Sequence, residues 1–412
     1  MPSAPERPDD NEVWQRVIRE LTDDLAVDAL ARDRAGKPPF DEIARLREAG
    51  LPALLTPPGP GRTGTDWRTA CAVVRELAAA DSSIAELMGR HYVLAWSARL
   101  FGLPGEAEPF ELRTAREQWL LGGSAELPEP ESEPDLTLTR AKAGYVLDGR
   151  RRLAAGITVV DRLIVGAPTA HTGELLIALV DPAHPGVTAA PVEEPLGQRL
   201  ADAGSVTFDR VPVPAEHIIG AAPRDEHAVT PFTALAPLAL RLMLVQVVLG
   251  IAEGALAEAR DLSRAVRAAR PASDGGDGEY GEYGKQPAAD PYLLLVYGEL
   301  AASAYSAAAV VERATRSLAR GLEAGAELGI DERADIAVLV AGAEVLANRA
   351  AVDITTRILE FTAGAGSVHG DPGLDRFWRN ARVLTAQNPL AHRLSDIGDH
   401  YLNGTSLRRS ER

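Results

Sequence analysis

The sequence predicts an α+β protein in which an antiparallel β domain lies between two helical regions. Apolar residues recur at helical spacing over the first third of the chain, alternate with polar residues over the next stretch, and then return to helical spacing. We therefore divide the chain into an N-terminal α-helical domain at residues 1–121, a middle β domain at 122–225 and a C-terminal helical bundle at 226–412.

The N-terminal domain is expected to hold three helical segments, because its apolar residues repeat with the period of a helix. The third segment places His91 within Met88-Gly89-Arg90-His91-Tyr92, where the surroundings are largely apolar. Two interpretations of His91 stay open: a buried histidine with satisfied hydrogen bonds, or an acid–base group at an active site. The segments are 13–33, 40–55 and 67–102, and the turn-rich connector 57–66 precedes the third.

The middle domain is expected to be antiparallel, because short alternating runs are separated by Gly, Pro and His residues. Its first strands are predicted to form a hairpin around Asp148-Gly149, a dipeptide typical of two-residue turns. Further strands are predicted at 161–169, 173–182, 186–194 and 204–214.

The C-terminal part predicts a bundle with close helix packing, because three long apolar segments each have an Ala-rich face. These segments are 231–270, 290–324 and 331–364. Residues 271–289 are Gly-rich and acidic, which is typical of a mobile loop and would also suit an active-site lid.

The least generic chemistry lies near the C-terminus. Gly364-Ala365-Gly366 is predicted to form a turn that exposes backbone N–H groups to a ligand, although such a turn is also an ordinary helix end. Residues 375–382 carry three arginines among aromatic and amide groups, which suits anions and planar rings as well as a surface salt-bridge cluster. Gln387-Asn388-Pro389 then breaks the chain before a final polar helix.

The composition narrows the class of protein. A formal net charge of −16 disfavours nucleic acid and anionic membranes as main partners. Cys71 is the only cysteine, so neither an intramolecular disulfide nor a Cys-based zinc site is expected, and we find no metal-ligand cluster. There is no signal-like N-terminus and no uninterrupted apolar run of transmembrane length. A cytoplasmic, soluble protein is expected.

Several stretches, taken in their order, resemble one enzyme superfamily over essentially the whole chain. Gly197-Gln198-Arg199 followed by Val211-Pro212-Val213-Pro214 is similar to the β domain of acyl-CoA dehydrogenases. Arg270-Pro271, Asp290-Pro291-Tyr292 and Arg376-Phe377-Trp378-Arg379-Asn380-Ala381-Arg382 resemble the group D flavin-dependent monooxygenases of that superfamily. This group includes dibenzothiophene monooxygenase, isobutylamine N-hydroxylase and nitrososynthases.

The resemblance implies an acyl-CoA dehydrogenase-like fold, with an N-terminal helical domain, a central antiparallel β-barrel and a C-terminal four-helix bundle. It also implies a two-component monooxygenase, in which a separate NAD(P)H-flavin reductase supplies reduced FMN or FAD, with FMN favoured. Together with O₂ this flavin would hydroxylate a small substrate at N, S or C in a natural-product or catabolic pathway. A homotetramer, or a dimer, is expected.

The resemblance also implies roles for particular residues. Arg270 would reach the flavin phosphate from a neighbouring subunit, and Gly364-Ala365-Gly366 and Ser124 would lie against the cofactor. Arg379 belongs to the arginine-rich segment and is expected to bind the cofactor too. His91 would manage a proton near the flavin–oxygen adduct.

Two positions depart from the dibenzothiophene branch. Ala155 precedes Gly156 where that branch has Ser or Thr, and Gln387 with Asn388 stands where it has a histidine. Both changes remove groups expected to hydrogen-bond the flavin or bound oxygen. Gln387 and Asn388 would then donate instead, or the chemistry would differ.

Two rival functions remain open. An acyl-CoA dehydrogenase or oxidase needs a carboxylate base, yet Leu240 beside Arg241 stands at one of the usual positions for it and no Tyr-Glu-Gly follows Gly366. The second rival is a degenerate homologue that binds flavin or a pathway intermediate without oxygenating it, which the changes at Ala155 and Gln387 would fit.

Overall fold

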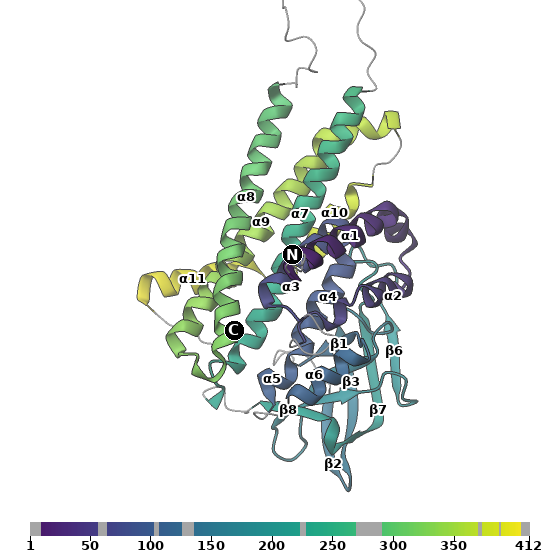
Figure 1. The fold of residues 1–412 in the computed structure, drawn as a ribbon, viewed down its shortest axis with the longest axis vertical. Coiled ribbons are helices and arrows are strands. Elements are labelled where there is room, and N and C mark those ends of the chain that lie inside the picture. The colour runs from purple at the N-terminus through teal and green to yellow at the C-terminus, as the bar shows by residue number, and fades with distance from the viewer. Residues whose placement is uncertain are drawn as a thin grey trace, which may run out of the picture.

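The computed structural model describes residues 10–56, 64–102, 107–125, 136–222, 228–268, 291–369, 373–386 and 389–404. Its elements follow the predicted order of a helical domain, a β domain and a bundle of long helices (Figure 1). The long helices form the upper part of the molecule, and the strands lie below them beside the N-terminal helices.

The N-terminal helices pack as a layer between the bundle and the sheets. Asp81 joins the third helix to the fourth: it follows α3, and its side chain accepts the N–H groups of Ser83 and Ile84 at 3.2 and 3.4 Å at the start of α4. The helices are α1 (Asp10–Ala35), α2 (Phe40–Glu48), α3 (Trp67–Ala80), α4 (Ser82–Ala95), α5 (Ser97–Phe101) and α6 (Ala107–Arg116).

The β domain consists of two four-stranded sheets, with strand orders β1-β4-β5-β8 and β2-β3-β7-β6. Every pair is antiparallel except β1 and β4, so the expectation of a wholly antiparallel domain is wrong at that edge. The β2–β3 hairpin of the other sheet lies between β1 and β4 in the chain and gives the long connection that parallel strands need. The strands are β1 (Leu121–Ser124), β2 (Leu136–Ala141), β3 (Gly144–Leu153), β4 (Arg162–Pro168), β5 (Leu175–Val180), β6 (Val187–Pro191), β7 (Gly204–Pro214) and β8 (Ile218–Ala222).

The predicted hairpin turn at Asp148-Gly149 is also wrong. Both residues lie inside β3, where the pairing with β7 shifts between Leu147 and Gly149, and the β2–β3 turn falls at residues 142–143. Gly149 has a φ of 121°, and the Asp148 carboxylate accepts the Arg210 N–H at 2.8 Å. The dipeptide therefore forms a β-bulge, which uses the same backbone freedom as a turn.

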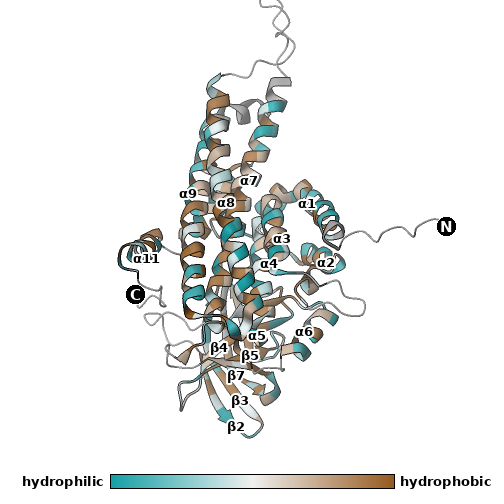
Figure 2. Cartoon of the chain, turned by 60° about the vertical axis from the view of Figure 1, so that its left-hand side comes forward, coloured by the Kyte–Doolittle hydropathy of each residue, from teal (hydrophilic) through white to brown (hydrophobic). Residues whose placement is uncertain are grey.

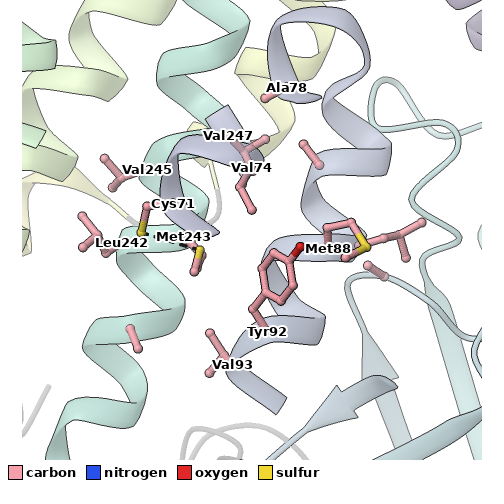
Figure 3. Close-up of a cluster of buried hydrophobic side chains, with 14 of the residues drawn as sticks. Cys71, Val74, Ala78, Met88, Tyr92, Val93, Leu242, Met243, Val245 and Val247 are labelled. Atoms are coloured by element: carbon pink, nitrogen blue, oxygen red, sulfur yellow. Dashed lines mark hydrogen bonds between the residues drawn. The ribbon is translucent and has the colours of Figure 1, made fainter. Parts of the chain in front are cut away.

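The bundle is built from three long helices, and α7 is its central member. It contacts α3 and α4 on one side and α8, α9 and α10 on the others. Figure 3 shows Cys71 and Val74 of α3, Tyr92 of α4 and Met243 of α7 pointing into a shared core. The helices are α7 (Ala236–Ala268), α8 (Pro291–Ala324), α9 (Ile330–His369), α10 (Asp375–Ala386) and α11 (Leu390–Asn403).

By length and averaged hydropathy, α7 and α8 would each be able to cross a membrane. The apolar part of α7 is 72% buried, as expected of a core helix, whereas that of α8 is only 22% buried. Apolar residues alternate with polar ones along α8 in Figure 2, and Tyr292, Leu295 and Tyr305 are mostly exposed. The outer face of α8 is therefore an apolar surface that the described part of one chain leaves uncovered.

The predicted turn at Gly364-Ala365-Gly366 is a helix in the structure. The α9 backbone continues through all three residues to His369. Glycine costs a helix interior only about 1 kcal/mol relative to alanine, and no proline interrupts the apolar run before it. Residues 57–63 of the predicted connector and the loop at 271–289 lie outside the described residues.

Candidate functional site

A pocket opens where α4, α5, β1 and α7 meet, at the junction of the helical domain, the sheet and the bundle. It holds about 430 Å³ of empty space, part of it open to solvent, and its walls are mainly apolar. A concave, mostly apolar site with a few polar groups is the usual form of a small-molecule site. The described lining residues are Arg90, Val93, Leu94, Ser97, Leu100, Phe101, Gly123, Ser124, Ala125, Ala236 and Leu240.

The wall formed by β1 suits a planar ring with polar edges. This strand lies at the edge of its sheet, so among the described residues only one of its sides pairs with another strand. Gly122 and Gly123 carry no side chains, and Ser124 ends the strand at the pocket. Both glycines are needed for packing inside the chain, because a Cβ on Gly122 would collide with Val160 and one on Gly123 would collide with the Ile164 backbone of β4. The outer edge of the strand is the side that a ligand can approach. The unpaired edge of β1 is the feature that would hold the polar edge of a flavin ring.

His91 lies behind this wall and is completely buried. Its Nε2 hydrogen bonds to the Pro52 carbonyl at 2.9 Å, and its Nδ1 accepts the Leu121 N–H at 3.0 Å, which together fix the tautomer with the proton on Nε2. Burial lowers the pKa of His91 to about 4, although the bond to Pro52 and the charge of Asp161 act in the opposite direction. These contacts are those of a buried histidine whose two ring nitrogens both form hydrogen bonds. To act as an acid or a base, the ring would have to break one of these two bonds.

The first residues of β1 are held from two directions. The Leu120 N–H donates to the Asp161 carboxylate at 2.7 Å, and that carboxylate also accepts a bond from Arg47 at 2.6 Å. With the bond from Leu121 to His91, the start of the strand is fixed just before it reaches the pocket. His91 therefore positions the pocket wall.

Arg90 supplies the charge at the pocket. Its Nε and Nη2 atoms donate to Glu86 Oε1 at 2.9 and 2.8 Å, one turn earlier on α4. The Glu86 side chain is 1% exposed and that of Arg90 is 15% exposed. Glu86 Oε2 accepts a further bond of 2.9 Å from Gln198 Nε2, so the carboxylate is satisfied on both oxygens.

A buried network continues from Gln198 to the C-terminal helices. Ser82 donates to Gln198 Oε1 at 2.8 Å and accepts a bond from Asn380 at 2.9 Å, while the Gln198 N–H donates to the Asn380 side chain at 2.7 Å. Two stretches identified in the sequence, Gly197-Gln198-Arg199 and the arginine-rich segment of α10, thus meet at the start of α4. Their side chains join the three parts of the fold.

Arg379 is held by ion pairs within the chain, and its predicted role in cofactor binding stays a prediction. It binds Asp33 of α1 and donates to Asp375 at 2.9 Å and to the Leu196 carbonyl at 3.1 Å. Its side chain is 11% exposed, and it does not line the pocket. These contacts tie α10 to α1 and to the β domain.

The other predicted site residues divide into three groups. Ser124 lines the pocket. Gly364-Ala365-Gly366 lies in the α9 helix, as described above. Arg270, Gln387 and Asn388 fall outside the described residues, so their predicted roles stay predictions.

Sequence reasoning missed Arg90 and Glu86. A usable signal existed, because the two residues are four apart on a helix whose other members are largely apolar. Opposite charges at that spacing can form an ion pair on one face of a helix.

No carboxylate is among the described residues that line the pocket, and no cluster of three or more metal-ligating side chains occurs in the described part of the chain. Leu240, at the position compared above with a dehydrogenase base, faces the pocket as an apolar side chain. Abstraction of a substrate proton by a carboxylate has no candidate base in this set of residues.

Two domain families match the chain. The N-terminal domain of acyl-CoA dehydrogenases matches residues 8–104, and the C-terminal domain of acyl-CoA dehydrogenases matches residues 242–388. Among curated proteins, a probable FMNH2-dependent monooxygenase of Pseudomonas putida is 34% identical over 392 residues, which is 94% of each chain. The dibenzothiophene monooxygenase of Rhodococcus qingshengii is 33% identical over 397 residues, 94% of this chain and 93% of that protein.

Solved structures give the same grouping. A dibenzothiophene monooxygenase from Paenibacillus sp. A11-2 superposes with a TM-score of 0.83 and 29% identity, covering 97% of this chain and 99% of that one. The same enzyme is known with FMN bound. The methanesulfinate monooxygenase of Pseudomonas fluorescens has a TM-score of 0.83 and 32% identity, covering 96% and 98% of the two chains.

Proposed function

Because this chain belongs to the FMNH2-dependent monooxygenases of the acyl-CoA dehydrogenase superfamily, we propose that the pocket between α4, β1 and α7 is its oxygenation site. The enzyme is a two-component flavin-dependent monooxygenase that acts on a small molecule. The observation that carries the proposal is an apolar pocket whose wall is a glycine-containing edge strand.

The overall reaction balances with reduced FMN as the source of electrons. Reduced FMN supplies two electrons and two protons, one atom of O₂ enters the substrate, and the other leaves as water. A separate reductase must regenerate the reduced flavin. NAD(P)H as the electron source of that reductase belongs to our proposal.

The residues of this chain bind and shield the reactants. In our proposal the polar edge of the flavin ring bonds to the backbone of β1 near Ser124, and the substrate lies between α4 and α7 against Val93 and Leu240. The apolar walls exclude water, which would otherwise lead to uncoupled consumption of reduced flavin. Arg270, Gln387 and Asn388 are proposed to complete the site, Arg270 from a second copy of the chain.

An organosulfur compound is the substrate class that we propose first. The names of two relatives specify sulfur compounds, dibenzothiophene and methanesulfinate. The mainly apolar walls of the pocket would supply contacts for the hydrocarbon part of such a compound. Assays with amine and indole substrates test the alternative, in which the enzyme oxygenates nitrogen or carbon instead of sulfur.

We propose a homotetramer, with a dimer as the smaller assembly that would also complete the site. The exposed apolar face of α8 supports this proposal, because a second copy would remove Tyr292, Leu295 and Tyr305 from water. The relatives indicate a soluble enzyme, and we propose that it acts in the cytoplasm, where a flavin reductase would be available.

A substitution that fills the pocket tests its assignment. Leu240→Phe adds volume inside the pocket, so we expect kcat/KM for methyl phenyl sulfide to fall by about tenfold or more while the protein stays folded. Leu256→Phe is the matched control, because Leu256 is a partly buried residue of the same helix outside the pocket. Equal kinetics for Leu240→Phe and the wild type would move the site elsewhere.

A further inference from the structure

Arg90 is the charged residue among the described lining of the pocket, and its surroundings define what it can recognise. Its charge is matched by Glu86, whose carboxylate is 2.8 Å away and nearly fully buried. Gln198 holds the other Glu86 oxygen, so the carboxylate is fixed beside the guanidinium. The pair is neutral as a unit, and the rest of the described lining carries no charge.

The bonds to Glu86 leave part of the guanidinium available. They use Nε and Nη2, and Nη1 has no partner among the residues that the structure describes. A guanidinium carries five N–H groups, and those left over at a pocket wall can donate to a ligand. The donor is strong because it belongs to an ionised group, yet it lies beside its own counterion.

The balance of charge separates two kinds of ligand. A neutral ligand with an oxygen acceptor gains a charge-assisted hydrogen bond and leaves no charge unpaired. An anionic ligand must lose its hydration in an apolar pocket, and Glu86 offsets the attraction of Arg90 for it. The relatives leave both kinds open, because one is named for a neutral aromatic compound and another for an anion.

We propose that Arg90 is the specificity-determining residue of this pocket and that the enzyme binds neutral, mainly apolar compounds with an oxygen acceptor in preference to sulfinate or carboxylate anions. This inference rests on the proposed function of the pocket. Glu86 is a positioning residue: it orients Arg90 and keeps the site neutral. Gln198 in turn orients Glu86.

The test uses three probes that share a phenyl ring: methyl phenyl sulfide, methyl phenyl sulfoxide and benzenesulfinate. Their dissociation constants are measured calorimetrically with the full-length protein saturated with oxidised FMN, so no turnover is needed. We expect the sulfoxide to bind about tenfold more tightly than the sulfide, the effect of one hydrogen bond to a charged donor. Benzenesulfinate should bind at least about tenfold more weakly than the sulfoxide.

Substitutions of Glu86 and Arg90 then test the effect of each charge on its own. Glu86→Gln leaves the Arg90 charge unmatched, so benzenesulfinate affinity should rise about tenfold or more while sulfoxide affinity stays within about threefold. The double substitution Glu86→Gln with Arg90→Gln should remove the advantage of the sulfoxide over the sulfide and leave sulfide affinity unchanged. Glu253→Gln breaks an ion pair with Arg75 outside the pocket and is the control that should change none of the three constants.

The wild-type ranking alone can overturn the proposal, even if a variant fails to fold: benzenesulfinate as the tightest of the three probes contradicts it. Equal changes in all three constants in Glu86→Gln contradict it as well. Failure of the proposed function looks different, because it would appear as absence of oxygenated product and would leave the ranking of probes intact. If this inference is wrong, the three probes will bind in a different order of affinity although the enzyme still forms oxygenated product.

Discussion

Arg90 and His91 are neighbours on α4 that serve the pocket in different ways. Arg90 reaches the pocket surface, whereas His91 turns away from it and binds backbone groups of residues 52 and 121. Adjacent residues on a helix point about 100° apart, so one turn of α4 presents a charge to the ligand and anchors β1 behind it. The wall of the pocket therefore depends on His91, which is not among the described residues that line the pocket.

The pH dependence of stability tests the role of His91. Its pKa is lowered to about 4 from 6.5 by burial, so the unfolded chain takes up a proton first as the pH falls. The contribution of His91 is fully present above pH 6.5 and is lost as the pH approaches 4, by about 3 kcal/mol in total. His91→Asn cannot be protonated in this range, and its side-chain oxygen can still accept the Leu121 N–H.

Urea unfolding at pH 7 and pH 4.5 measures this difference. We expect His91→Asn to be less stable than the wild type at pH 7, by about 1–3 kcal/mol, because the Pro52 carbonyl loses its partner. This difference in the free energy of unfolding should become smaller or change sign at pH 4.5. A gap that does not change with pH would mean that the ring is not buried and neutral.

The sequence predicted some of the site residues and not others for a physical reason. His91 and Ser124 were found because their residue types and neighbours resemble a known pattern, and Ser124 does line the pocket. The partners of His91 are backbone atoms far away in the chain, which no residue pattern encodes. Arg379 has the chemistry of an anion site, but Asp33 of a distant helix decides its contacts.

At the scale of elements, α7 links the core to the pocket. Its first turns carry Ala236 and Leu240 at the pocket, and its middle packs against α3. Gly254 lies so close to the Ala79 backbone that a Cβ atom would collide with it. The position of the pocket wall therefore depends on the close approach of these two helices.

Gly254→Ala should be destabilising even though alanine favours helices. The new methyl group must push α7 away from α3, and overpacking of this kind costs about 1–3 kcal/mol. Gly342→Ala inside α9 is the matched control, because nothing among the described residues lies within 4 Å of its added Cβ and helix propensity should stabilise it by about 0.5–1 kcal/mol. Thermal melts that shift in the same direction for both variants would show that the α3–α7 contact is loose.

Element order was readable from periodicity, because burial of one face imposes it on each segment. Helix lengths were not, because the predicted helical segment 67–102 is three helices, α3, α4 and α5, and α6 was not predicted. Two predictions were wrong because the same residue types occur in more than one kind of local structure. Asp148-Gly149 supplies a bulge in place of a turn, and Gly364-Ala365-Gly366 stays helical. The parallel pairing of β1 with β4 depends on which sheet the intervening hairpin joins, and local patterns do not specify that.

At the scale of the whole molecule, one chain leaves an apolar face uncovered and a proposed site incomplete. Tyr292 and Tyr305 of α8 are 79% and 74% exposed. Apolar side chains exposed in this way on a long helix usually pack against another chain. A second copy on this face would also explain how Arg270 could reach a flavin bound to its neighbour.

Charged substitutions on α8 test this assembly. In Leu295→Glu with Tyr305→Glu, two acidic groups would have to be buried at the interface, so sedimentation at micromolar concentration should show a shift from tetramer toward smaller species. The affinity for FMN should fall with it if Arg270 comes from the partner. Glu323→Gln near the far end of α8 is a control that leaves the exposed apolar residues intact. A wild-type monomer with full FMN affinity would exclude the proposed assembly.

The most direct measurement of the central claim follows the oxygen atoms. The protein is mixed with chemically reduced FMN, heavy-isotope dioxygen (¹⁸O₂) and methyl phenyl sulfide or dibenzothiophene, and the products are analysed by mass spectrometry. A monooxygenase that uses this pocket yields a sulfoxide carrying one labelled oxygen atom, and Leu240→Phe yields much less of it. Labelled hydrogen peroxide without labelled sulfoxide, across sulfur, amine and indole substrates, would contradict the account and identify a flavin-binding protein that does not oxygenate.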